Sequence, residues 1–74
     1  MKNVKKGLIA RSRILIAIET QPSEGTAIAK EKNLSYGIVM HHLRLLKGEG
    51  IVNRKGRRPY VWFLTGLGQK RLLR

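Results

Sequence analysis

The stretch from Leu34 to Val52 constrains the fold more than any other part of the chain, because its apolar residues recur at the period of an α-helix. A helix from about Ser35 to Lys47 would gather its apolar side chains, with one histidine, on one half of its surface. The residues expected to be buried are Ile38, Val39, His42, Leu43, Leu45 and Leu46. The exposed half would carry Tyr36, Gly37, Met40, His41, Arg44 and Lys47. Such a helix requires a core on one side and presents a basic, hydrogen-bonding face on the other.

The residues before this helix have the spacing of a helix-turn-helix, a pair of helices joined by a tight turn. A short helix is expected over Thr26 to Lys32, and Ala29 within it is small enough to let the two helices cross closely. Asn33 tolerates the left-handed conformation that the turn requires, and Val39 supplies a β-branched core residue on the second helix. Ser35 is the expected N-cap of the second helix, and two glycines end it.

A first helix is expected from about Val4 to Thr20, with one apolar face toward the core. That face would be formed by Val4, Leu8, Ile14, Leu15 and Ile18. Arg11 falls within the same stripe, where its side chain can extend past the edge of the core. Ile9 and Ile16 lie on the opposite side, and we interpret them either as ordinary exposed residues or as a subunit contact. The segment from Gln21 to Gly25 contains proline and glycine, which predicts a turn.

After the second helix of this pair, the apolar period changes from that of a helix to that of a strand. Two β-like runs, Ile51 to Lys55 and Pro59 to Thr65, are joined by a short basic segment, which predicts a hairpin with a cationic tip. The second run is apolar on both faces, so we expect it to be covered on both. Thr65 is the expected N-cap of a closing helix. The candidates for burial on that helix are Leu67, Leu72 and Leu73.

Charge narrows the class of binding partner. Lysine and arginine number 16 against four glutamates and no aspartate, which gives the chain of 74 residues a formal charge of +12. An imbalance of this size attracts a polyanion, with DNA or RNA as the first candidate and an anionic membrane surface as the second. The run from Ile14 to Ile18 is far too short to span a bilayer. We therefore expect a cytoplasmic, nucleoid-associated protein that does not insert into membranes.

Catalysis and metal binding have little support in the sequence. The absence of cysteine removes thiolate ligands and cysteine nucleophiles, and the isolated glutamates form no acid–base pair. His41 and His42 are adjacent, so on a helix they point about 100° apart and cannot easily share one ion. His42 is expected to be a core or half-buried histidine. We predict neither enzymatic activity nor a cofactor.

Five short motifs spread over nearly the whole chain form one recognisable pattern. They are Ile14-Leu15-x-x-Ile18, Ile28-Ala29-Lys30-Glu31, Val39-Met40-His41-His42-Leu43, Leu46-x-x-x-Gly50-Ile51-Val52 and Tyr60-x-Trp62-x-Leu64-Thr65-x-x-Gly68. In these motifs the chain resembles small prokaryotic winged-helix regulators of the ArsR and MarR types, and small archaeal DNA-binding relatives. The expected fold is one domain over residues 1–74, mainly α, with a three-helix core, a small β-hairpin wing and a short C-terminal helix.

The resemblance implies that the third helix enters the major groove of double-stranded DNA and that the wing reaches the adjacent backbone or minor groove. Such proteins usually bind as homodimers. The residues expected to contact DNA are Ser35, Tyr36, Gly37, Met40, His41, Arg44, Lys47, Arg54, Lys55, Arg57 and Arg58. The chain lacks the cysteine-based metal site of many ArsR-like sensors and the long flanking helices of MarR-like proteins. Met40 also stands where a short polar residue is common.

Two alternatives to a DNA-binding transcriptional regulator stay open at this point. The charge also suits a chromatin protein without sequence preference, or a protein associated with RNA or the ribosome. The apolar residues outside the expected core would suit a winged helix that binds another protein. The surface for that second alternative would be formed by Ile9, Ile16, Val61 and Phe63.

Overall fold

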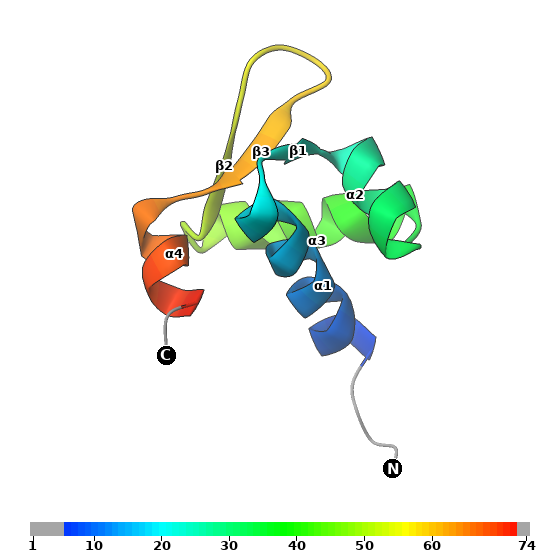
Figure 1. Cartoon of the computed structure of the whole chain (residues 1–74), viewed down its shortest axis with the longest axis horizontal. Helices are drawn as coiled ribbons and strands as arrows, with labels where there is room; N and C mark the ends of the chain where they lie inside the picture. Colours follow the sequence, from blue (N-terminus) through cyan, green and yellow to red (C-terminus); the bar gives the residue numbers. More distant parts are fainter. Residues whose placement is uncertain (1–5, 73–74) are drawn as a thin grey trace.

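The computed structural model describes the backbone of residues 6–72 and the side chains of residues 9–70. Its elements are α1 (Lys6–Thr20), β1 (Ser23–Glu24), α2 (Gly25–Lys32), α3 (Tyr36–Gly48), β2 (Val52–Lys55), β3 (Val61–Leu64) and α4 (Gly66–Leu72). Figure 1 shows the β2–β3 hairpin, hereafter the wing, extending to one side of the helices, while α4 and the start of α1 lie on the opposite side. The predicted winged helix, with a three-helix core, a β-wing and a closing helix, is confirmed.

The helix-turn-helix forms as the sequence predicts. Asn33 adopts the left-handed conformation, with φ 55° and ψ 48°, and the Leu34 N–H donates to the Ala29 carbonyl oxygen at 2.9 Å. Ser35 caps α3, because its side-chain oxygen accepts a hydrogen bond from the Ile38 N–H at 3.2 Å. These local contacts fix where α3 begins.

The core lies where α1, α2 and α3 meet the sheet. The largest fully buried side chains are Trp62, Ile14, Ile28, Leu43, Leu46, Val39 and Val52. Ala10, Ala17 and Ile18 bring α1 into the same core, and Leu15 packs against its edge. The expected burial of Val4, Leu8, Leu72 and Leu73 falls outside the described side chains.

The sheet has a strand that the sequence pattern did not predict. Ser23–Glu24, expected to lie within a turn, form β1, which pairs antiparallel with β3 so that Ser23 lies opposite Trp62. The sheet order is therefore β1-β3-β2, with β3 in the centre. The prediction of a plain turn over Gln21 to Gly25 was wrong because the strand is created by a partner distant in sequence. α1 and α4 also contact β3, in which Trp62 is buried and Val61, Phe63 and Leu64 are half-buried.

Three of the residues that the sequence pattern marked for burial are exposed. Ile38 and Leu45 on α3 retain 46% and 49% of their accessible surface, and Leu67 on α4 retains 46%. The apolar half of α3 is wider than its core contact, because α1, α2 and β2 enclose just the arc that carries Val39, Leu43 and Leu46. The prediction that Ile38 and Leu45 belong to the core is therefore wrong.

Two links tie the end of α3 to the rest of the molecule. The Arg11 guanidinium donates two hydrogen bonds to the Glu49 carboxylate, at 2.9 and 3.2 Å, so Arg11 leaves the apolar stripe of α1 at its edge. Thr65 caps α4 by accepting from the Gly68 N–H at 3.0 Å, and its hydroxyl donates to the Gly50 carbonyl oxygen at 2.6 Å. The predicted capping role of Thr65 is confirmed.

Candidate nucleic-acid interface

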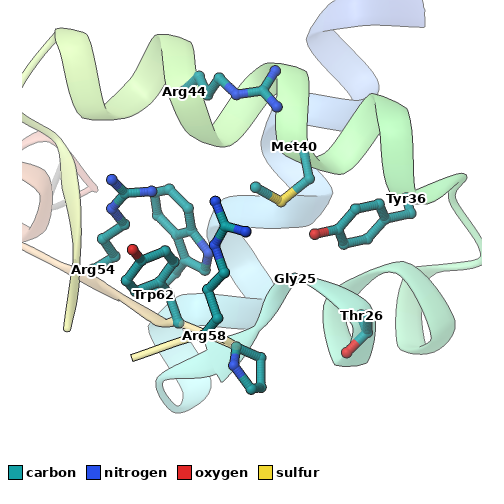
Figure 2. A pocket seen from close by; sticks show the side chains of 10 residues that line it. Gly25, Thr26, Tyr36, Met40, Arg44, Arg54, Arg58 and Trp62 are labelled. Atoms are coloured by element: carbon teal, nitrogen blue, oxygen red, sulfur yellow. The ribbon is translucent and has the colours of Figure 1, made fainter. Parts of the chain in front are cut away.

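An open hollow of about 660 Å³ lies between α3, the start of α2 and the wing. We call it the α3–wing hollow. One wall is formed by Tyr36, Met40 and Arg44 from α3. The other is formed by Arg54, Arg58 and Trp62 from the wing. Figure 2 shows Arg44 above Met40, with the Tyr36 hydroxyl and the Arg58 guanidinium extending into the space between the two elements.

The α3 wall follows from helical spacing. Tyr36, Met40 and Arg44 are four residues apart, which places them in one row along the helix. Tyr36 is 53% exposed, Arg44 is also exposed, and Met40 is half-buried against the core. The row therefore runs from an aromatic ring over an apolar thioether to a cation.

Gly25 lets the start of α2 approach this row closely. A Cβ atom at Gly25 would lie 3.0 Å from the Met40 sulfur and 3.4 Å from Tyr36 Cε1, so a larger residue would push both side chains. The sequence pattern placed Gly25 in a turn and indicated no part for it in the site. No local pattern could have revealed this role, because the contact joins two separate helices.

On the wing side of the hollow, the Arg54 side chain makes cation–π contacts with the rings of Tyr60 and Trp62. The Arg54 guanidinium carbon lies 4.1 Å from the centroid of the Tyr60 ring and 5.8 Å from that of Trp62. Arg54 is directly opposite Trp62 in the β2–β3 register, so both lie on the same face of the sheet. Lys55 is on the other face, with its Nζ 5.6 Å from the Phe63 ring. Trp62 itself is 2% exposed, which makes it a core residue.

The structure brings together five of the residues expected to contact DNA. Tyr36, Met40, Arg44, Arg54 and Arg58 line the α3–wing hollow, although they come from two elements. The remaining expected residues are exposed but do not line it; they are Ser35, Gly37, His41, Lys47, Lys55 and Arg57. Of these, Ser35 serves as the N-cap of α3.

The arginines that line the hollow form no ion pair with another described residue. Between described residues, ion pairs join Arg11 to Glu49 and Lys32 to Glu31, and neither involves a lining arginine of the hollow. Three arginines therefore surround one concave surface without a described carboxylate partner. Such a surface attracts an anion through charge-assisted hydrogen bonds.

The two adjacent histidines lie on α3 outside the hollow, with His41 exposed and His42 half-buried. Their ring centroids are 5.3 Å apart with the planes at 71°, an edge-to-face arrangement. Partial burial lowers the pKa of His42 below its usual value, and the nearby His41 and Arg11 lower it further. Among the described residues, no group of three His, Cys, Asp or Glu side chains is placed to hold a metal ion.

Residues 10–54, more than half of the chain, match the sequence model of bacterial regulatory proteins of the arsR family. No curated protein sequence matches the chain significantly. In the part of the chain that the structure describes, no helix has both the length and the apolar character needed to cross a membrane.

Several solved structures share the fold. The Zα domain of PKZ from Carassius auratus, in complex with Z-DNA, is 26% identical with a TM-score of 0.76, over 82% of this chain and 100% of that one. The transcriptional regulator BldR from Sulfolobus solfataricus is 21% identical with a TM-score of 0.78, over 89% of this chain and 50% of that one. The homodimeric winged helix-turn-helix domain of Mb0332 from Mycobacterium bovis is 23% identical with a TM-score of 0.74, over 90% of this chain and 65% of that one. This chain thus spans about half the length of BldR.

Proposed function

The chain belongs to the ArsR family of bacterial regulatory proteins, and we propose that it binds duplex DNA with α3 in the major groove and the wing on the adjacent backbone or minor groove. As a member of this family, the protein is a DNA-binding transcriptional regulator.

The convergence of arginines from α3 and from the wing on one hollow carries this proposal. Arg44 faces Arg54 and Arg58 across the α3–wing hollow, so a single strand of phosphates seated there would meet cations from both walls. The remaining exposed cations, Lys47, Lys55 and Arg57, extend the basic surface along α3 and the wing. Phosphate contacts of this kind set the orientation of a protein on DNA and supply much of its affinity.

The exposed residues of α3 divide between two roles. Arg44 and His41 are the side chains on α3 with donors suited to base edges, while Tyr36 and the free N–H groups near Ser35 suit a phosphate. Gly37 has open space around its Cβ position, so the helix backbone can approach a groove closely there. Met40 offers an apolar surface at the border between α3 and the hollow.

Fluorescence anisotropy with a mixed-sequence DNA duplex and an RNA duplex of the same sequence tests this arrangement. We expect tighter binding to DNA, because the deep, narrow major groove of A-form RNA excludes a helix. The variant Arg57→Ala/Arg58→Ala should weaken DNA binding and flatten the plot of log K against log salt by about 0.9 for each phosphate that it no longer neutralises. Arg44→Ala should also weaken binding.

Lys70→Ala is the matched control for charge, since it removes one exposed cation on α4, away from the hollow. We expect its affinity and salt slope to stay close to those of the unmodified protein. Equal reductions in affinity for Lys70→Ala and Arg44→Ala would mean that overall charge, rather than the α3–wing surface, determines binding.

We further propose that the protein binds DNA as a two-fold homodimer. The homodimeric Mb0332 domain supports this arrangement, as does the exposed apolar pair Ile9 and Ile16 on α1, which are 39% and 52% exposed. A two-fold dimer would contact half-sites about one helical turn, ~34 Å, apart.

A second candidate function is binding of left-handed DNA. The observation that favours it is the Zα domain in complex with Z-DNA, which this chain matches over that domain's full length and at 26% identity. Titration of an alternating dC–dG duplex, followed by circular dichroism, separates the two functions. Inversion of the duplex spectrum on adding protein would favour left-handed DNA, whereas an unchanged right-handed spectrum with binding would favour the major-groove arrangement.

A further inference from the structure

Two large apolar side chains lie exposed on α3 beside the residues proposed to contact DNA. Ile38 is 46% exposed and Leu45 is 49% exposed. They are seven residues apart, so they form one line along the helix about 10.5 Å long. On the helical period, His41 falls between this line and Arg44, which lines the α3–wing hollow. The line is therefore part of the outer surface of α3 and continuous with its basic face.

Most side chains that read a particular base are missing from α3. Asn and Gln read adenine, and Asp and Glu accept a hydrogen bond from cytosine. The sequence of α3, YGIVMHHLRLLKG, contains none of these four, and its one hydroxyl belongs to Tyr36, which lines the hollow. Arg44 can read guanine. Apolar side chains distinguish one further feature of the major groove, the C5-methyl group of thymine.

The surroundings of the line favour DNA over a protein partner. Arg44 and Lys47 are exposed on the same helix, and α3 from Tyr36 to Gly48 carries no acidic residue. At Gly37 and Gly48 nothing lies within 4 Å of a Cβ position, so the backbone of α3 can come near the floor of a groove. On the helical period Arg44 lies about 100° from Leu45, on the side of the hollow, so the apolar line has a cation on one side, as a thymine methyl group has a phosphate backbone beside it.

Resting on the proposed function, we infer that Ile38 and Leu45 read thymine methyl groups in the major groove. With a rise of about 3.4 Å per base pair, a line of ~10.5 Å along the groove spans about three base pairs. Target sites should therefore carry thymines about three base pairs apart beside α3. Burying one methyl group against an apolar side chain changes affinity about fourfold.

Uracil lacks just the C5-methyl group of thymine, so it provides a direct test. Anisotropy at fixed low salt compares an alternating dA–dT duplex with a dA–dU duplex of the same length. The unmodified protein should bind the thymine duplex about four- to sixteenfold more tightly, depending on whether one or both residues contact a methyl group. Ile38→Ala/Leu45→Ala should bind both duplexes equally. Leu67→Ala, which truncates an equally exposed leucine on α4, should retain the full preference.

The outcomes separate this inference from the proposed function. Equal affinity of the unmodified protein for the two duplexes would overturn the inference and leave DNA binding intact. A thymine preference that persists in Ile38→Ala/Leu45→Ala would overturn the assignment to these two residues. Failure to bind either duplex would overturn DNA binding itself, and the inference with it. Thermal melting of the variant should match that of the unmodified protein, because both replaced side chains are exposed.

Discussion

At the scale of single residues, His42 shows how the fold changes the properties of a side chain. It lies half-buried on α3, close enough to Arg11 on α1 for that cation to act on its charge. Burial removes water from the ring, while His41 and Arg11 oppose a positive charge on it. All three effects lower the pKa of His42 and favour its neutral form in the folded protein.

We predict that this histidine makes stability depend on pH. Between the lowered pKa of folded His42 and the usual value of 6.5, the unfolded chain binds more protons than the folded one. The free energy of unfolding should therefore fall as the pH decreases through 6.5, and this contribution is fully present at higher pH. Urea denaturation from about pH 7.5 to 5.5 measures it. His42→Gln should have a smaller pH slope, and an identical slope would contradict the prediction.

At the scale of elements, α4 packs closely against the backbone of Ile51, which follows α3. Ile51 lies buried just after α3, and its carbonyl oxygen accepts the Thr65 N–H at 3.0 Å. A Cβ atom at Gly68 would collide with that same carbonyl oxygen. Because the obstacle is backbone rather than a flexible side chain, Gly68 is the residue that permits α4 to dock.

Gly68→Ala should therefore destabilise the protein by about 1–3 kcal/mol, the usual cost of overpacking a buried site. Gly37→Ala is the matched control, because the space around Gly37 is open, and it should stay within about 0.5 kcal/mol of the unmodified protein. Chemical denaturation of both variants gives the comparison. Similar stabilities for the two variants would show that α4 moves away from Ile51 at little cost.

At the scale of the whole molecule, the formal charge of +12 opposes contact between copies except where the surface is apolar. The exposed pair Ile9 and Ile16 lies on α1, and the hollow lies between α3 and the wing, so a dimer through α1 would leave both hollows open. Bivalent binding then raises affinity for paired half-sites without any new contact.

We predict that Ile16→Glu shifts the protein from dimer to monomer in sedimentation equilibrium, because a carboxylate at the contact would lose its water. Its affinity for paired half-sites should fall about 10²-fold or more, while its affinity for a single half-site stays close to that of the unmodified protein. Ala27→Glu places the same charge at an exposed position on α2 and should remain dimeric. A dimer that survives Ile16→Glu would exclude this face of α1.

The sequence by itself determined the helix-turn-helix, the wing and the closing helix. Each depends on local rules: the left-handed turn at Asn33, the cap at Ser35, and the change of apolar period after α3. Because these signals act over a few residues, they can be recognised without knowledge of the rest of the chain.

The tertiary structure alone decided four other features. β1 exists because β3 lies beside it, the role of Gly25 comes from the close approach of two helices, and Ile38 and Leu45 are exposed because neighbouring elements cover a narrower arc of α3 than its apolar pattern suggests. The α3–wing hollow likewise requires Arg44 and Arg58 to meet across separate elements. The physical reason is the same in each case. The sequence pattern shows which side chains are apolar or charged, but the neighbours of a residue depend on how elements distant in the sequence pack together.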